Sequence, residues 1–258
     1  WGHVYLQTYG SKQLLHTKTS TTMNLGVTLA KAGKRVLLLD FDPQHNLSNY
    51  LKEEKYELTI AEAIQQELKN QFEYENNLIQ NYSENLDYIP TSLNLSAIEM
   101  SLIMASAREY ILSDIFNRLN VKEKYDYVLI DCMPALNILL INALTASTSV
   151  LIPVEASYGA FEGLGQLFQY IELVKKRLNR GLEVEGILFT KVSNTKISKE
   201  VKNRLSEEYG NVLLKQEIKE LTEARRSYAE RVPLQQMAKS KLAENYVALA
   251  KEILEKGE

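Results

Sequence analysis

Short runs of consecutive apolar residues, separated by segments with helical spacing, constrain the fold of this chain more than any other feature. Five such runs are rich in Val, Ile and Leu: residues 35–40, 86–90, 127–131, 149–155 and 186–191. A strand that is buried on both faces of a parallel sheet reads as a continuous apolar run, whereas a half-exposed strand alternates. These runs therefore predict the strands of a parallel sheet.

The segments between these runs carry apolar residues at the spacing of amphipathic helices. They predict helices over residues 20–32, 60–70, 96–119, 137–147, 160–179, 197–209 and 239–256. Gly33 and Gly210 follow two of these segments, where glycine commonly ends a helix, and Ser240 opens the last one. Strand–helix alternation along the whole chain predicts an α/β fold, in which a doubly wound, mostly parallel sheet has helices on both faces.

Composition indicates how the chain is organised. The 258 residues include five prolines and no Ser/Gly-rich linker, so we expect one domain over residues 1–258, with the polar stretch 52–85 as a surface excursion that contains one helix. Cys132 is the only cysteine, which excludes an intrachain disulfide and favours a cytoplasmic location. No apolar run approaches the roughly 18 residues of a membrane span, so no membrane association is expected.

A candidate phosphate-binding site lies in residues 11–26, with the sequence SKQLLHTKTSTTMNLG. Lys18 and Thr19 form the lysine–hydroxyl pair that ends a Walker A loop, and a helix is expected to follow them. The lysine would neutralise phosphate charge, and the threonine hydroxyl would bind Mg²⁺. Because such pairs are common, this one alone is a weak signal.

Three carboxylates follow two of the predicted strands. Asp40 and Asp42 come at the end of the run 35–40, and Asp131 ends the run 127–131. Open α/β sheets bind ligands at the carboxyl ends of their strands, and residues i and i+2 of an extended segment point the same way. Asp131 occupies the position of a Walker B carboxylate, which holds Mg²⁺ through water. An alternative role for Asp42, which precedes Pro43, is to cap the next turn.

With these motifs in place, the chain resembles the ParA/MinD family of deviant Walker A ATPases, and most closely its ParA/Soj partition branch. The resemblance runs from about residue 4 to residue 254 and is carried by passages such as NLGVTLAKAGKRVLLLDFDPQHNLS, YDYVLIDCMPALNILLINALTAS and LEVEGILFTKV. It implies a P-loop NTPase fold and a homodimer that closes on ATP and Mg²⁺. It further implies nonspecific DNA binding and a ParB-like partner that stimulates hydrolysis during plasmid or chromosome segregation.

The resemblance also implies roles for individual residues. Lys18, Thr19 and Ser20 match the residues that bind the nucleotide phosphates. Thr19, Asp40 and Asp131 match the groups around Mg²⁺. Asp42 matches the aspartate that positions the attacking water, which makes Lys18 and Asp42 the expected catalytic residues.

The loop before Lys18 departs from the family pattern Lys-Gly-Gly-x-Gly-Lys-Thr. Its five residues are Gln13-Leu14-Leu15-His16-Thr17, so all three glycines and the signature lysine are replaced. Glycine lets such a loop curl its amides around phosphate, and another residue in that geometry costs about 1–3 kcal/mol. The sequence therefore leaves two functions open: a partition ATPase, or a pseudo-ATPase of the same fold that binds DNA or protein without hydrolysing nucleotide.

Charge is unevenly distributed along the chain. The net charge is −3, yet residues 170–241 hold 16 Lys and Arg against 10 Asp and Glu. This balance is consistent with a local basic surface that could contact DNA, and equally with ordinary solvated helix faces.

Overall fold

The strands form two sheets that lie next to each other. The computed structural model describes residues 3–5, 15–51, 56–133, 135–155, 157, 160–193 and 195–256. One sheet has the order β1-β6-β7 and the other has the order β3-β4-β2-β5, and β1 also contacts β5. The strands are β1 (His3–Tyr5), β2 (Val36–Phe41), β3 (Gln80–Ser83), β4 (Leu86–Ile89), β5 (Tyr127–Cys132), β6 (Ser149–Glu155) and β7 (Glu183–Thr190). All pairings are parallel except that of β3 with β4, so the mostly parallel α/β fold predicted from the apolar runs is confirmed.

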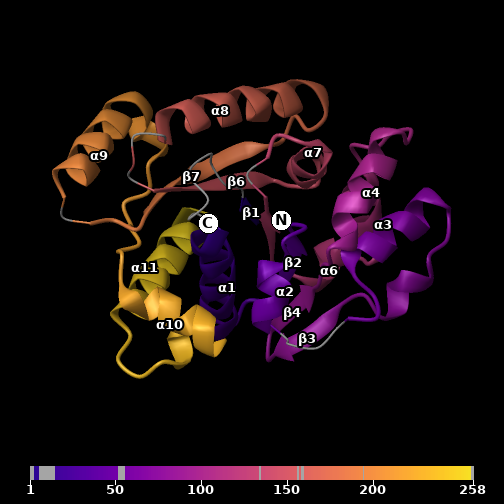
Figure 1. Cartoon of the computed structure of the whole chain (residues 1–258), viewed down its shortest axis with the longest axis horizontal. Helices are drawn as coiled ribbons and strands as arrows, with labels where there is room; N and C mark the ends of the chain where they lie inside the picture. Colours follow the sequence, from indigo (N-terminus) through magenta and orange to yellow (C-terminus); the bar gives the residue numbers. More distant parts are fainter. Residues whose placement is uncertain are drawn as a thin grey trace.

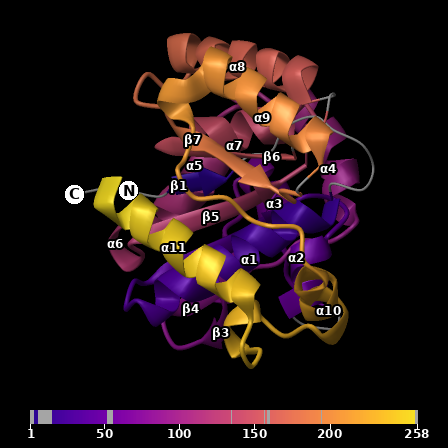
Figure 2. The same cartoon turned by 90° about the vertical axis from the view of Figure 1, so that its left-hand side faces the viewer.

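Helices cover both faces of the strands. They are α1 (Leu15–Lys31), α2 (Asn46–Leu51), α3 (Ile60–Leu68), α4 (Asn94–Ile103), α5 (Ile111–Arg118), α6 (Val121–Lys124), α7 (Ile138–Thr145), α8 (Ala160–Arg177), α9 (Lys196–Tyr209), α10 (Thr222–Glu230) and α11 (Lys241–Lys256). Short 3₁₀ helices are η2 (Glu73–Asn76), η3 (Gly210–Val212) and η4 (Leu234–Gln236). Figures 1 and 2 show α8 and α9 on one side of β6 and β7, with α1 and α11 on the other.

Alternate residues of one strand supply the cores on the two faces. In β2, Leu37 and Leu39 belong to the apolar cluster under α3, α5, α7 and α8, whereas Val36 and Leu38 belong to the cluster under α1 and α11. All four side chains are 0% exposed. This double burial is the physical reason that the strand reads as an uninterrupted apolar run, because successive side chains point to opposite faces.

Glycine ends α1 as expected. Gly33 has a φ of 82°, and its amide donates to the Ala30 carbonyl at 2.9 Å, while the Lys34 amide donates to the Leu29 carbonyl at 3.1 Å. These two bonds form a Schellman motif, which requires a left-handed residue at the Gly33 position. The motif stops α1 and directs the chain into β2.

Two expectations from the sequence were wrong in part. Residues 96–119 do not form one helix: α4 ends at Ile103 and α5 begins at Ile111, with Ala107 at a φ of 50° between them. The Asn142 side chain donates to the Arg108 carbonyl at 2.8 Å, so a tertiary contact holds this break. The stretch 52–85 is also more than a surface excursion, because it contributes edge strand β3 and buries Tyr74 completely.

Candidate functional site

The carboxyl ends of β2 and β5 bring two of the predicted carboxylates together. The strands pair in parallel register, with Asp40 opposite Asp131 and Phe41 opposite Cys132. Asp40 is 0% exposed and Asp131 is 3% exposed. Two carboxylates that are 91 residues apart in the chain therefore occupy neighbouring positions at one edge of the sheet.

Helix α1 adds a hydroxyl to this edge. Thr19 lies in its second turn, is buried, and donates from Oγ1 to Asp131 Oδ2 at 2.7 Å. The bond joins the predicted Walker A hydroxyl to the predicted Walker B carboxylate across 112 residues of sequence. This contact is the geometric centre of the candidate site.

Asp40 is held firmly by its surroundings. Its Oδ2 accepts from the Ser48 amide and the Ser48 hydroxyl, both at 2.7 Å, and its Oδ1 accepts from the Asp42 amide at 3.3 Å. Burial raises the pKa of Asp40 well above its usual value, the neighbouring Asp131 raises it further, and the bonds from Ser48 oppose this rise. Two like charges in a buried position favour a proton or a cation between them.

This donor set fits Mg²⁺. A hydroxyl and two carboxylates are hard oxygen ligands, and Mg²⁺ is commonly held by one or two carboxylates while keeping several waters. Thr19, Asp131 and Asp40 are the residues that could hold it. Within the described ranges, no cluster of three or more His, Cys, Asp or Glu residues has the arrangement of a metal site, so a cation here would depend on water or phosphate for its remaining ligands.

Asp42 lies in the turn that follows β2. It is 5% exposed, and its Oδ1 accepts from the Gln44 amide at 2.9 Å, while its carbonyl accepts from the His45 amide at 2.8 Å. The capping role considered for Asp42 is therefore present. A carboxylate has two oxygens with several acceptor positions, so a capping carboxylate can also orient a water molecule.

The remaining predicted residues lie in α1. Ser20 is 8% exposed, and its carbonyl and hydroxyl accept from Asn24 Nδ2 at 2.8 and 3.2 Å. Lys18 is in the first turn of α1, and its side chain is outside the described part of the structure, as are Gln13 and Leu14 of the glycine-free loop. Because α1 begins at Leu15, two positions at which the family pattern has glycine, Leu15 and Thr17, have helical backbone here.

Sequence reasoning missed the residues that support the site. Ser48 links Asp40 to the Thr91 amide, which donates to Ser48 Oγ at 2.8 Å, and Asn24 links Ser20 to Leu234. Both residues lie within the passage NLGVTLAKAGKRVLLLDFDPQHNLS that carries the family resemblance, but no role was predicted for either of them. Their links to Thr91 and Leu234 come from segments that are distant in the sequence, so the local sequence pattern carries no sign of them.

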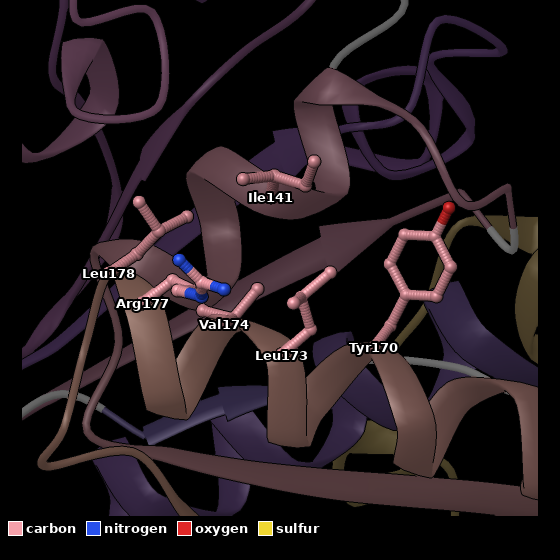
Figure 3. A pocket seen from close by; sticks show the side chains of 6 residues that line it. All are labelled: Ile141, Tyr170, Leu173, Val174, Arg177 and Leu178. Atoms are coloured by element: carbon pink, nitrogen blue, oxygen red, sulfur yellow. The ribbon is translucent and has the colours of Figure 1, made fainter.

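An apolar groove of about 320 Å³ lies away from this edge, between α7 and α8 (Figure 3). It is lined by Ile141, Tyr170, Leu173, Val174, Arg177 and Leu178. None of the predicted site residues lines it, so the groove is separate from the carboxylate edge.

Among the described helices, none is long and apolar enough to cross a membrane.

Comparison with known proteins gives matches over most of the chain. The sequence profile of the family described as "AAA domain" matches residues 16–184. The chain is 38% identical over 245 residues to the sporulation initiation inhibitor protein Soj of Bacillus subtilis. This alignment covers 93% of the chain and 94% of Soj. It is 35% identical over 246 residues to the chromosome partitioning protein ParA of Myxococcus xanthus, covering 93% of this chain and 84% of ParA.

Solved structures share the fold. Cobyrinic acid a,c-diamide synthase from Mycobacterium smegmatis, with a bound ATP analog and magnesium, superposes with a TM-score of 0.81 at 27% sequence identity. The similarity covers 100% of this chain and 96% of that one.

Proposed function

This chain belongs to the ParA/MinD family of P-loop ATPases, and from that premise we propose that it is a partition ATPase acting on plasmid or chromosomal DNA. The observation that carries the proposal is the 2.7 Å bond from Thr19 to Asp131, beside Asp40 and at the carboxyl ends of β2 and β5. The similarity to Soj and ParA over 93% of the chain supports the same activity.

Each site residue has a task in ATP hydrolysis. Lys18, in the first turn of α1, neutralises phosphate charge. The backbone amides of this turn have no partner within the helix and can donate to phosphate oxygens. Ser20 follows as a further phosphate contact. Thr19, Asp131 and Asp40 would hold Mg²⁺. When bound, Mg²⁺ offsets negative charge on the phosphate oxygens. Asp42 accepts a hydrogen bond from the attacking water and orients it.

The second candidate function is a pseudo-ATPase that binds DNA or protein without hydrolysing nucleotide. The observation that favours it is the glycine-free loop, in which Leu14 and Leu15 replace residues without side chains. Apolar side chains near a polyanion would weaken its binding, because phosphate needs polar or charged partners.

We infer that the chain is one domain, because both apolar clusters combine residues from early and late segments of the sequence. One cluster includes Leu37 and Leu205, and the other includes Met23 and Ile253. From the family membership we also infer that the chain works as a homodimer. A nonspecific DNA surface and a ParB-like partner complete the proposal. The balance of 16 basic against 10 acidic residues over positions 170–241 supports the DNA surface.

Calorimetry with Mg²⁺-ATP tests the proposal. We expect the wild-type protein to bind Mg²⁺-ATP with a Kd of about 1 μM, which corresponds to about 8 kcal/mol, and we expect Lys18→Ala to abolish this binding. Asp42→Ala should retain binding and lose hydrolysis, since it removes the group that orients water. No binding at millimolar ATP would leave the pseudo-ATPase as the function, and DNA retention that is equal with and without ATP would contradict an ATP-driven cycle.

A further inference from the structure

A C-terminal segment bridges the two halves of the candidate site. This segment, residues 222–236, is called the clasp here and comprises α10, the turn after it and η4. Figure 2 shows α10 close to both α1 and α2. The clasp lies more than 170 residues from both elements in the sequence, so its contacts are purely tertiary.

The first end of the clasp holds the turn that carries Asp42. Tyr228 of α10 donates from its hydroxyl to Asn46 Oδ1 at 3.2 Å, and Asn46 is the residue at which the turn enters α2. The turn itself contains His45 in the left-handed region, at a φ of 48°. Non-glycine residues in that region persist when surrounding contacts hold them. Tyr228 supplies such a contact from outside the turn.

A second hydroxyl pair strengthens this end. Tyr50 of α2 lies 2.9 Å from Ser227 Oγ, and Ser227 donates its own hydroxyl proton to the Val232 carbonyl at 2.7 Å. A serine hydroxyl has a single proton to donate, so Tyr50 is the donor of the first bond. The rings of Tyr50 and Tyr228 are 5.8 Å apart, so α2 and α10 also pack through their aromatic groups.

The other end of the clasp holds α1 beside Ser20. The Leu234 amide donates to Asn24 Oδ1 at 2.9 Å, and Gln235 Nε2 donates to the Asn24 carbonyl at 2.8 Å. Asn24 is 0% exposed, and its amide group donates to Ser20 in turn. One fully buried side chain therefore connects the clasp to a predicted phosphate contact.

Tyr228 also lies within electrostatic reach of the carboxylate edge. Burial raises the pKa of Tyr228, and the charges of Asp40 and Asp131 raise it further, while Arg231 lowers it. Through its bond to Asn46, the hydroxyl of Tyr228 is close to the turn that carries Asp42, and Tyr228 is not one of the predicted ligands.

We propose that the clasp fixes the position of the Asp42 turn relative to Ser20, and that Tyr228 is a positioning residue that acts through Asn46. This inference rests on the proposed function for the roles of Asp42 and Ser20, whereas the mechanical link between Tyr228 and the turn does not depend on ATP. The two can therefore be tested apart.

Hydrogen–deuterium exchange on the full chain without nucleotide tests the link. Tyr228→Phe removes only the hydroxyl, and loss of one hydrogen bond should speed exchange of the amides at residues 44–48 by about fivefold. Tyr110→Phe is the matched control, because Tyr110 is on the other side of the strands and its hydroxyl is 3.5 Å from the Leu178 carbonyl. Unchanged exchange at residues 44–48 in Tyr228→Phe would overturn the inference.

Asn46→Ala supplies a second variant that removes the acceptor of the same bond. The double variant should exchange no faster than the faster of the two single variants, because the effects of removing two partners of one hydrogen bond do not add. Additive effects would mean that Tyr228 and Asn46 act independently, contrary to the proposal.

Steady-state hydrolysis separates positioning from general structure. Tyr228→Phe should lower kcat about fivefold and leave KM for Mg²⁺-ATP near the wild-type value, since the hydroxyl supports the Asp42 turn rather than the nucleotide. A rise in KM with unchanged kcat would contradict the assignment. If wild type hydrolyses no ATP, the proposed function fails, and the exchange result alone decides the inference.

Discussion

Replacement of Ser48 by alanine should destabilise the protein strongly, because its hydroxyl joins two buried groups. Ser48 Oγ donates to Asp40 Oδ2 at 2.7 Å and accepts from the Thr91 amide at 2.8 Å. Asp40, Ser48 and Thr91 are 0, 1 and 2% exposed, so water cannot replace the lost bonds. A buried hydrogen bond contributes about 0.5–3 kcal/mol, with the upper values for a charged partner, and an unsatisfied buried amide costs about 1–3 kcal/mol. We expect Ser48→Ala to lower the free energy of unfolding by about 3 kcal/mol.

Ser198→Ala is the matched control for this prediction. Ser198 is also buried, at 3% exposure, but its hydroxyl makes no hydrogen bond within the described part of the chain. Removing it should leave the free energy of unfolding unchanged or slightly higher.

Urea denaturation monitored by far-UV circular dichroism measures both variants. A loss of about 3 kcal/mol shifts the midpoint by roughly 1 M when the denaturant slope is about 3 kcal/mol/M. Equal midpoints for Ser48→Ala and Ser198→Ala would refute the reasoning, because the two substitutions would then cost the same despite different bonding.

Three further predictions concern the metal, pH and packing. Thr19→Val should weaken Mg²⁺-ATP binding at least about tenfold in calorimetry, since a metal ligand is lost, and should also lower the metal-free melting temperature, because the buried Asp131 loses the hydrogen bond from Thr19. The bonds from Arg35 lower the pKa of Asp126, so this pair stabilises the fold above the unfolded carboxyl pKa of about 3.9, and the stabilisation is lost as pH falls through the lower folded pKa. Asp126→Asn should therefore lower the urea midpoint more at pH 7 than at pH 3. A Cβ at Gly186 would lie 2.8 Å from Leu214 Cγ, so Gly186→Ala should lower the free energy of unfolding by about 1–3 kcal/mol, measured by thermal unfolding. A Cβ at Gly165 of α8 would meet nothing within 4 Å, so Gly165→Ala should leave the stability unchanged or raise it.

The positions of the strands could be predicted from the sequence because their signal is local. The run 149–155 coincides with β6, and the runs 127–131 and 35–40 match β5 and β2 to within one residue at each end. Burial on both faces imposes apolar side chains at every position, so the pattern needs no knowledge of neighbours. The break between α4 and α5 could not be predicted, because helical spacing continues across it and the Asn142 contact comes from another helix.

Part of the site also followed from the sequence. The rule that parallel strands bind ligands at their carboxyl ends brought Asp40 and Asp131 to one edge. The structure adds that Thr19 bonds to Asp131 and that Ser48 bonds to Asp40. The roles of these residues in catalysis remain predictions.

The sequence by itself determined the α/β alternation, the family resemblance and the candidate carboxylates, because each depends on residue types at short spacing. Only the tertiary structure decided which polar groups support them. Tyr228 reaches Asn46 across 182 residues and the Leu234 amide reaches Asn24 across 210, and such contacts exist only once the sheet has formed and α10 has packed against α1 and α2. Serine, asparagine and tyrosine are common surface residues, so their composition carries no sign of these bonds. Burial gives them their importance, since a polar group without water must find its partner within the protein.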